Sequence, residues 1–529
     1  MSTVNWFARR IYVTRSRWRV VFVLVAATST AALSACVGLD VLNPNGLAVD
    51  NVYSSAANTE AALVGSWRAY HALLTGTCPT LPMSVHGNDN TQTSITYIDF
   101  SAEPRLPINN RDNLNCLTRF GYNNAYEAIA GGRDSYQGII SNKLKFGVVD
   151  TVTPNGKDTP SRLIFAKFII AMGQLNVGLH FDKGYITDFD TPKESTGGAL
   201  KPYQEVTANA IAQFRGVIAD VRATPAFTFP TTWINGRPIT SDELIRICLS
   251  NITRAEVYMA RTPTERAAVN WAAVLARLDS GIVRDFAQQA DPAISPTASP
   301  YLNNSFAQNT LRISNRLIGP SDTSGVYQTW LATPLAGRAA ITVTTPDRRI
   351  HGATNTTTGT RFIRQTTSMS SATNGPYLTS QYRSIRYLNT AADSGNRALY
   401  LYVSMDEQKY IRAEALWRLS RFAEAAALIN PTRVAANLKP VDANGPPAGR
   451  DCVPRADDGS CGTLFDAIQY EKRIDLYPYA GSAIAFFDQR AWGKLVSGTP
   501  IHWPVVGREL TTMGLPYYTF GGGGPGSAP

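Results

Sequence analysis

The segment QKYIRAEALWRLSRFAEAAALIN, residues 408–430, constrains the fold more than any other part of the chain. Its pattern predicts two short helices, with the small residues Ala413, Ala415 and Ala425 at close-packing positions and a tight turn at Ser420-Arg421. A single hairpin of this kind cannot bury its apolar face, because repeat units are stable only when they stack on neighbours. The rest of the chain must therefore supply its partners.

Three other parts of the chain repeat this pattern. We predict helix pairs near 59–144, 161–221 and 243–288, in addition to the pair at 404–430. In the second of these, Phe165, Phe168, Ile169 and Met172 recur at spacings of three and four residues, which is the pattern of a buried helical face. The sequence therefore predicts a mainly α fold with a solenoid-like core of stacked helix pairs.

Two long stretches, 78–120 and 289–398, do not follow the helical pattern, and we interpret them as insertions that form a second, ligand-binding lobe. Long segments of this kind are usually functional or disordered, and their aromatic content argues against disorder. The ligand-binding candidates are polar groups and aromatic rings, namely Asn88, Asp89, Asn90, Tyr97, Tyr327 and Trp330. The alternative is that Tyr327 and Trp330 only pin the insertion to the core. The glycine-rich end, 521–529, is predicted to be a flexible tail.

The N-terminus has the features of a bacterial lipoprotein signal. Five arginines precede the apolar run 20–33, which is shorter than the about 20 apolar residues of a spanning helix. The sequence LSAC then matches a lipobox, so residues 1–35 form the signal peptide and Cys36 is the lipidation site. The alternatives are a secreted protein cut near Ala35 or an uncleaved anchor.

Composition excludes one class of partner. Removal of residues 1–35 lowers the formal charge from +10 to +5, because the segment contains five arginines and no acidic residue. The remaining basic residues are scattered without the clustered stripe that nucleic-acid binding requires. We therefore expect no nucleic-acid partner.

Export places the remaining cysteines in an oxidising compartment. Cys452 and Cys461 flank a turn-forming segment, and we predict a local disulfide between them. Cys78 with Cys116 is a second possible pair. Cys248 lies in an apolar helical pattern and is predicted to be a buried small hydrophobic residue.

The sequence contains no recognisable catalytic motif. The five histidines lack the spacing of a metal site, and neither a nucleophile elbow nor a phosphate-binding loop is present. The glycines Gly521, Gly523 and Gly526 match a dinucleotide-binding pattern only by accident. We therefore expect no enzyme activity, no catalytic residue and no cofactor, with a structural calcium ion left open. Paired carboxylates for glycoside hydrolysis can be brought together by the fold alone, so a surface glycosidase stays an alternative.

Segments along the whole chain resemble the SusD/RagB family of outer-membrane nutrient-binding lipoproteins. They are Cys36 followed by LDVLNPN, the RAEALWRL and FAEAAALIN helices, IQYEKRIDLYPYAG, FFDQRAW and HWPVVGREL. In the motif region 464–510, the family pattern is matched by Glu471, Arg473, Asp475, Leu476, Gly481, Asp488, Trp492 and Pro504. Lys472 and Ala480 depart from it, which suggests a divergent branch. We expect Glu471, Arg473 and Asp488 to form ion pairs that hold the C-terminal helices on the repeats.

The resemblance implies tetratricopeptide-like helix pairs in 36–529, a lipid anchor in the outer membrane, and a TonB-dependent transporter as partner. It also implies an oligosaccharide or peptide ligand. It assigns no ligand-contacting residue, because in the family these lie in variable loops. The main alternative is a lipid-anchored helical-repeat scaffold for envelope assembly, which leaves the aromatic insertions without a role.

Overall fold

The computed structural model describes ten stretches of the chain, which are residues 52–75, 83–92, 98–110, 116–193, 198–234, 236–290, 311–364, 375–386, 398–477 and 483–529. Cys36, Cys78, Tyr97, Ala480 and Gly481 lie outside the described residues, so the expectations placed on them stay predictions.

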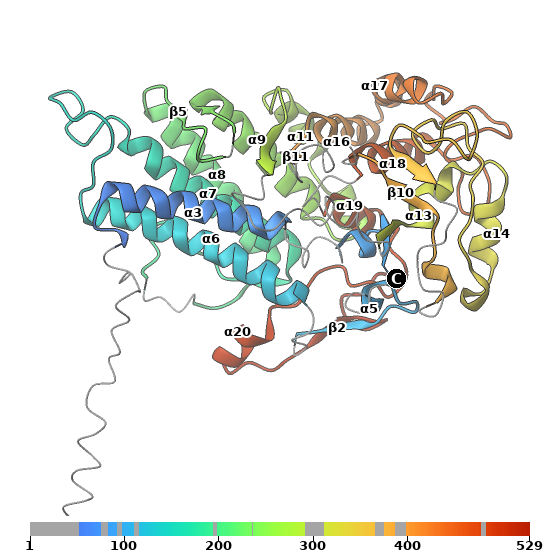
Figure 1. The fold of residues 1–529 in the computed structure, drawn as a ribbon, viewed down its shortest axis with the longest axis horizontal. Helices are drawn as coiled ribbons and strands as arrows, with labels where there is room; N and C mark the ends of the chain where they lie inside the picture. Colours follow the sequence, from blue (N-terminus) through green and yellow to red (C-terminus); the bar gives the residue numbers. More distant parts are fainter. Residues whose placement is uncertain are drawn as a thin grey trace, which may run out of the picture. The chain divides into compact units, whose positions relative to one another are not determined.

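The fold is mainly helical, as predicted, and successive helices contact one another in a row. The row consists of α3 (Ala56–Thr75), α6 (Cys116–Ser141), α7 (Thr159–His180), α8 (Tyr203–Ala223), α9 (Ser241–Tyr258), α11 (Trp271–Leu278), α16 (Met405–Arg418), α17 (Phe422–Ala435) and α18 (Leu464–Leu476). Helices α3, α6, α7 and α8 lie side by side in Figure 1. The hairpin formed by α16 and α17 thus has the stacked partners that its sequence requires.

The hairpin is built as its small residues indicate. Ala413, Ala415 and Ala425 are fully buried, and Ser420 adopts a φ of 59° in the turn between the helices. In the third pair one expected helix is divided into two. Thr262 caps α10 (Pro263–Ala267), and Asn270 then caps α11 by accepting a hydrogen bond from the Ala273 N–H at 3.1 Å. A side-chain cap at this position starts a new helix, which is why the chain breaks here.

Helix α7 lies at the centre of the main core. Among the described residues it is the helix that is long and apolar enough to cross a membrane, but 89% of its apolar window is buried inside the protein. Phe165 stacks on Trp233 with ring centroids 4.7 Å apart, and Phe168 stacks on Trp67 at 5.9 Å. The periodic apolar residues of this helix are therefore core residues.

Of the short antiparallel strand pairs in the described residues, three join segments that are close in the sequence and three join distant segments. They are β1 (Asn90–Gln92) with β8 (Leu311–Ile313), β2 (Pro107–Asn109) with β12 (Thr519–Gly521), β3 (Lys183–Gly184) with β4 (Lys201–Pro202), β5 (Thr228–Phe229) with β6 (Ile239–Thr240), β7 (Phe286–Ala290) with β11 (Ala398–Val403), and β9 (Phe362–Arg364) with β10 (Tyr382–Ser384). The pair β1–β8 joins the two predicted insertions to each other.

The described parts of both insertions are folded, and the second insertion has a hydrophobic core of its own, whereas Met83, Val85, Phe100 and Ile108 of the first insertion belong to the main core. They contain α5 (Ile98–Ser101), α13 (Asn315–Ile318), α14 (Val326–Ala332) and three 3₁₀ turns, η1 (Gly319–Ser321), η2 (Leu335–Gly337) and η4 (Pro376–Leu378). Residues of the second insertion, among them Ile313, Phe362 and Tyr382, pack with Tyr470 and Ile474 of α18. The second insertion therefore forms a lobe against the C-terminal helices, whereas the first insertion packs with the main core, so the prediction of one lobe built from both insertions is corrected.

The motif residues near the C-terminus form the expected buried ion pairs. Glu471 contacts Arg349 at 2.7 Å and Arg433 at 2.8 Å. On α19 (Ile484–Trp492), Asp488 contacts Arg266 of α10 at 2.9 Å. Arg473 differs from the expectation, because its partner at 3.2 Å is Asp89 of the first insertion and not a residue of the repeats.

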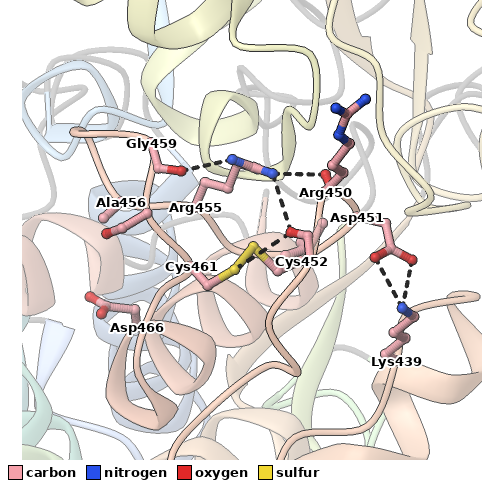
Figure 2. Close-up of a disulfide and its surroundings, with 12 residues drawn as sticks. Lys439, Arg450, Asp451, Cys452, Arg455, Ala456, Gly459, Cys461 and Asp466 are labelled. Atoms are coloured by element: carbon pink, nitrogen blue, oxygen red, sulfur yellow. Dashed lines mark hydrogen bonds and ion pairs between the residues drawn. A yellow bond between two sulfur atoms is a disulfide. The ribbon is translucent and has the colours of Figure 1, made fainter.

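Cys452 and Cys461 are joined by the disulfide that their spacing predicts, with an S–S distance of 2.05 Å. Figure 2 shows that Arg455 lies inside this loop, where it donates to the carbonyl oxygens of Gly459 at 2.7 Å and Arg450 at 2.8 Å. Cys248 is free and buried, as predicted, and burial raises the pKa of its thiol.

The prediction of a flexible tail at 521–529 is wrong. β12 pairs with β2, and beyond it the Ile501 N–H donates to the Gly526 carbonyl at 2.9 Å. The Ala528 N–H donates to Thr499 at 2.8 Å, and the Ala528 side chain is buried. The number of glycines suggested a flexible segment, but in the structure these glycines permit tight turns and close backbone pairing.

Candidate functional site

The polar residues predicted to bind a ligand from the first insertion are buried and bonded within the protein. Arg473 donates to the Asn88 carbonyl at 3.0 Å and to Asp89 Oδ1 at 3.2 Å. Asn90 donates to Ser84 Oγ at 2.7 Å. Burial raises the pKa of Asp89 to about 6, although Arg473 opposes this. These residues join the first insertion to α18, so the expectation that they face a ligand is corrected.

The two predicted aromatic contacts, Tyr327 and Trp330, belong to the second core. They are 3% and 6% exposed, respectively. The Tyr327 ring lies directly against Gly319, where an added Cβ would be 2.2 Å from Tyr327 Cδ2. The Trp330 ring centroid is 5.5 Å from the guanidinium group of Arg316 and 4.8 Å from that of Arg338. These rings pin the insertion to the protein, which was the alternative to an exposed platform.

Some of these predicted residues do meet around a cavity. Asn88, Asn90, Trp330 and Tyr377 line a polar space of about 30 Å³. Space of that order holds individual water molecules. It does not hold a sugar ring, so these residues do not form a sugar site in this arrangement.

A much larger cavity, of about 610 Å³, opens on one face of α6. Its volume is within the range of about 300–1,000 Å³ that is typical of small-molecule sites. The lining residues from α6 are Tyr122, Asn123, Tyr126, Ile129, Ala130 and Arg133. Their spacing of about four and seven residues places them on one side of the helix. We call this cavity the α6 pocket.

The second wall of the α6 pocket follows β3. The Tyr185 N–H donates to the Tyr126 hydroxyl at 2.6 Å, and that hydroxyl donates to the Tyr185 carbonyl at 2.9 Å. Gly184 permits this approach, because a Cβ there would lie 2.4 Å from Val177 Cγ1 and 2.8 Å from the Tyr126 hydroxyl. The backbone of β3 is therefore fixed against α6, and the Tyr185 ring is fixed with it.

The third wall is α20 (Gly507–Thr512), which lies beside one end of α6 in Figure 1. The Tyr185 hydroxyl is 2.8 Å from Met513 Sδ and 3.4 Å from Glu509 Oε2. Burial, together with the nearby Glu509 carboxylate, raises the pKa of Tyr185 to about 12. The phenol is therefore neutral at physiological pH and able to donate a hydrogen bond.

The tyrosines of the α6 pocket pack against one another, and Tyr126 is the most exposed of them, since Tyr122 and Tyr185 are 1% and 7% exposed. The ring centroids of Tyr122 and Tyr126 are 4.7 Å apart, and those of Tyr126 and Tyr185 are 5.7 Å apart in an edge-to-face arrangement. Polar groups stand at its border, with Arg133 on α6 and Glu509 on α20. Rings next to hydrogen-bonding groups suit a ligand that has both apolar faces and hydroxyl or amide groups.

The described residues give no sign of a metal centre. No group of three or more histidine, cysteine, aspartate or glutamate side chains is placed to hold an ion within the part of the chain that the structure describes. The α6 pocket likewise has a single carboxylate among its lining residues, Glu509.

The residues of the α6 pocket were not predicted from the sequence. Tyr122, Tyr126 and Arg133 lie within a predicted core helix, and their spacing was interpreted as helix packing. A signal was present, because tyrosine, asparagine and arginine share one face of that helix. Their partners Tyr185 and Glu509 lie in different parts of the sequence, and no local pattern connects them with α6.

Comparisons with known proteins agree with the fold. No family model and no curated protein matches the sequence. Solved structures do match: a SusD superfamily protein from Bacteroides fragilis has a TM-score of 0.53 at 14% identity, covering 87% of this chain and 98% of its own. A SusD superfamily protein from Bacteroides vulgatus has a TM-score of 0.51 at 12% identity, covering 86% and 97%. A SusD homolog from Bacteroides thetaiotaomicron has a TM-score of 0.51 at 12% identity, covering 88% and 90%. The chain therefore has the fold of the SusD superfamily.

Proposed function

We propose that this protein is a lipid-anchored outer-membrane protein that binds an oligosaccharide in the α6 pocket and passes it to a TonB-dependent transporter. The observation that carries the proposal is the pocket itself, a cavity of about 610 Å³ with three adjacent tyrosines and a polar border. The SusD fold and the sequence resemblance to nutrient-binding lipoproteins support it. A peptide with an aromatic or aliphatic side chain is the second ligand class that this chemistry accepts.

Sugar binding explains the pairing of groups in the pocket. The C–H faces of a pyranose stack on tyrosine rings, and its hydroxyls need paired donors and acceptors. Asn123 and Tyr185 supply neutral donors, while Glu509 accepts hydrogen bonds. Each aromatic contact contributes about 0.5–1.5 kcal/mol beyond area burial. A few such contacts give dissociation constants of about micromolar to millimolar, which suits capture followed by release.

The anchor is proposed at Cys36. A single acyl chain holds a protein only marginally, whereas two or more chains hold it firmly, at about 0.8 kcal/mol per buried methylene. Cys36→Ala should therefore release the protein from membranes into the soluble fraction. Recovery of that variant in the membrane fraction after a high-salt wash would argue against lipidation as the tether.

We propose a binding protein and not an enzyme, because retaining and inverting glycosidases need two carboxylates about 5–10 Å apart across the substrate. The α6 pocket offers Glu509 alone among its lining residues. The scaffold alternative predicts no small ligand. The absence of any hit on combined glycan and peptide arrays, together with copurification of assembly factors and no transporter, would favour the scaffold.

The test is to screen the Cys36→Ala chain on glycan and peptide arrays and then to titrate the best ligand by calorimetry. Tyr185→Ala should weaken binding by about two- to tenfold, since it removes one aromatic contact. Trp417→Ala is the matched control, a half-buried aromatic residue on α16 that stacks on Phe465 at 4.2 Å outside the pocket. Equal affinities of Tyr185→Ala and the parent, with circular dichroism unchanged, would remove the α6 pocket from the binding site.

A further inference from the structure

The connection between α6 and α7 exposes an unusual number of apolar side chains. Ile140, Val148, Val149 and Val152 are 54%, 63%, 50% and 86% exposed, respectively. Val152 is the most exposed of the large apolar residues in the described part of the chain. Clustered exposure of this kind usually marks an interaction surface. We call residues 140–157 the α6–α7 loop.

The α6–α7 loop is held in a definite conformation. Asp150 Oδ1 accepts hydrogen bonds from the Val152 N–H at 2.9 Å and the Thr153 N–H at 2.7 Å. The Lys157 N–H donates to the Val148 carbonyl at 2.9 Å, which closes the base of the tip. Phe146 is buried and anchors the loop on the helices. These bonds keep the valines facing outward instead of folding into the protein.

The loop also carries positive charge. Lys143, Lys145 and Lys157 are exposed, and none of them forms an ion pair with another described residue. The loop itself contains one acidic residue, Asp150, whose carboxylate accepts hydrogen bonds in the turn and attracts Lys157, and the Asp158 carboxylate lies beside Gly147. Exposed aliphatic groups flanked by lysines are the combination that binds an anionic lipid surface.

The base of the loop contacts the first residues of the folded body. Asn142 Nδ2 donates to the Tyr53 carbonyl at 2.8 Å, and a Cβ at Gly138 would lie 2.7 Å from Tyr53 Cβ. Tyr53 follows Cys36 by 17 residues. A tether of that length reaches at most about 60 Å when fully extended. An acylated Cys36 would therefore keep the base of the loop within about 60 Å of the bilayer, which permits the loop to reach it.

From these observations we propose that the α6–α7 loop rests on the lipid surface in which the Cys36 acyl chains are embedded. Val148, Val149 and Val152 enter the boundary between headgroups and acyl chains, and the lysines contact lipid phosphates. The inference rests on the lipid anchor of the proposed function. An anchor alone does not fix the orientation of the protein on the membrane, whereas a second contact restricts it.

The first test places a photocrosslinking residue, p-benzoylphenylalanine, at Val152 of the full chain in its native membranes. The matched control carries it at Val283, which is 69% exposed on the connection between α11 and β7. We expect lipid adducts at position 152 and none at position 283. An adduct with another protein, or no adduct, would overturn the proposal. Flotation of the same samples separates the hypothesis of the lipid anchor from that of the loop contact. A chain that does not float contradicts both, whereas a chain that floats without a lipid adduct at position 152 contradicts only the loop contact.

The second test does not depend on acylation. The Cys36→Ala chain is titrated with vesicles of phosphatidylglycerol and phosphatidylcholine. The combined change Val148→Ser, Val149→Ser and Val152→Ser should lower partitioning by about tenfold or more, because the apolar contact is lost. The matched change Val283→Ser with Val434→Ser, both exposed elsewhere, should leave it unchanged. Equal partitioning of the loop variant and the parent would refute the lipid contact, even if the anchor is confirmed.

The charge on the loop has its own signature in this assay. Each of Lys143→Gln and Lys145→Gln should lower vesicle binding by about fivefold at low ionic strength, and the effect should fade in high salt. Vesicles of phosphatidylcholine alone should bind weakly and without salt dependence. Binding that is independent of vesicle charge would contradict the role of the lysines.

Discussion

The buried ion pairs between the repeats and the C-terminal helices provide a sharp test of how this fold is stabilised. Arg266 is fully buried and donates to Glu414 Oε1 at 3.0 Å and Oε2 at 2.7 Å. It also donates to Asp488 Oδ1 at 2.9 Å, while Lys472 contacts Asp488 Oδ2 at 2.6 Å. Two carboxylates thus share one guanidinium group in the interior.

The two carboxylates differ in how well their charges are compensated. Burial opposes ionisation of Glu414, but the two-point contact with Arg266 outweighs it and the pKa falls below the usual range. Burial raises the pKa of Asp488, and Lys472 and Arg266 offset only part of this. The fold therefore stabilises the charge of Glu414 and disfavours that of Asp488.

Neutralising each carboxylate should then have unequal effects. Glu414→Gln removes the two-point partner of Arg266 and leaves two buried cations, Arg266 and Lys472, with one carboxylate, Asp488, so it should lower the free energy of unfolding by about 3–5 kcal/mol. Asp488→Asn removes a charge that the interior disfavours, and Arg266 keeps Glu414, but the buried Lys472 loses its carboxylate partner. Its cost should therefore be smaller than that of Glu414→Gln but larger than that of weaker hydrogen bonds alone, about 2–3 kcal/mol.

The assay is urea unfolding of the Cys36→Ala chain, monitored by circular dichroism. Glu424→Gln is the control, because Glu424, in the first turn of α17, pairs at 2.5 Å with Arg421 at the start of the same helix, and both side chains are exposed to solvent. The urea midpoint of this variant should equal that of the parent. Because the pKa of Glu414 is depressed, its stabilising contribution is fully present above the unfolded pKa of about 4 and is lost as the pH falls through the folded pKa. The difference in the free energy of unfolding between Glu414→Gln and the parent should therefore shrink below about pH 4. Equal losses for Glu414→Gln and Asp488→Asn would refute the reasoning.

Three further predictions concern single features. Cys452→Ser should lower the free energy of unfolding by about 2–3 kcal/mol, because a closed loop restricts the unfolded chain; nonreducing peptide mapping should find Cys452 linked to Cys461, and two free thiols would contradict this. Trp330→Ala should cost about 3–5 kcal/mol in urea unfolding without changing ligand affinity, whereas weaker binding by a stable variant would return Trp330 to the site. The raised pKa of Asp89 stabilises the fold below the unfolded pKa of about 4, and this contribution is lost as the pH rises through the folded pKa of about 6. Asp89→Asn should therefore reduce the decrease in the free energy of unfolding between these two pH values; an unchanged slope would disprove the burial effect.

Local patterns in the sequence predicted the helical row well. The three- and four-residue spacing of Phe165, Phe168 and Met172 indicates a buried face wherever the helix lies, because the geometry of a helix is local. The alanines of 408–430 indicate close helix contacts for the same reason, and all three are buried. Cys452 and Cys461 are close enough in the sequence, on the two sides of a turn, for their disulfide to be predicted without knowledge of the fold.

Features that depend on distant partners were not predictable. The glycines of 521–529 suggest flexibility by themselves, but the backbone of Thr499 and Ile501 supplies their hydrogen bonds. The sequence around Trp330 suggests an exposed platform, but in the structure the guanidinium groups of Arg316 and Arg338 contact its ring and the side chain is buried. In both cases the burial depends on a residue that is distant in the sequence, so no local sequence pattern can predict it.

By itself the sequence determined the elements whose physics lies within one helix or one turn: the helix pairs, the small-residue contacts, the loop disulfide and the expectation of a lipid-bearing Cys36. Only the tertiary structure decided where a ligand has room. The α6 pocket exists because Tyr126 fixes Tyr185 and because Tyr185 in turn meets Glu509, and these contacts join segments that are far apart along the chain. A cavity is the volume that packing leaves unfilled, so it depends on all of its walls together and is present in none of their sequences.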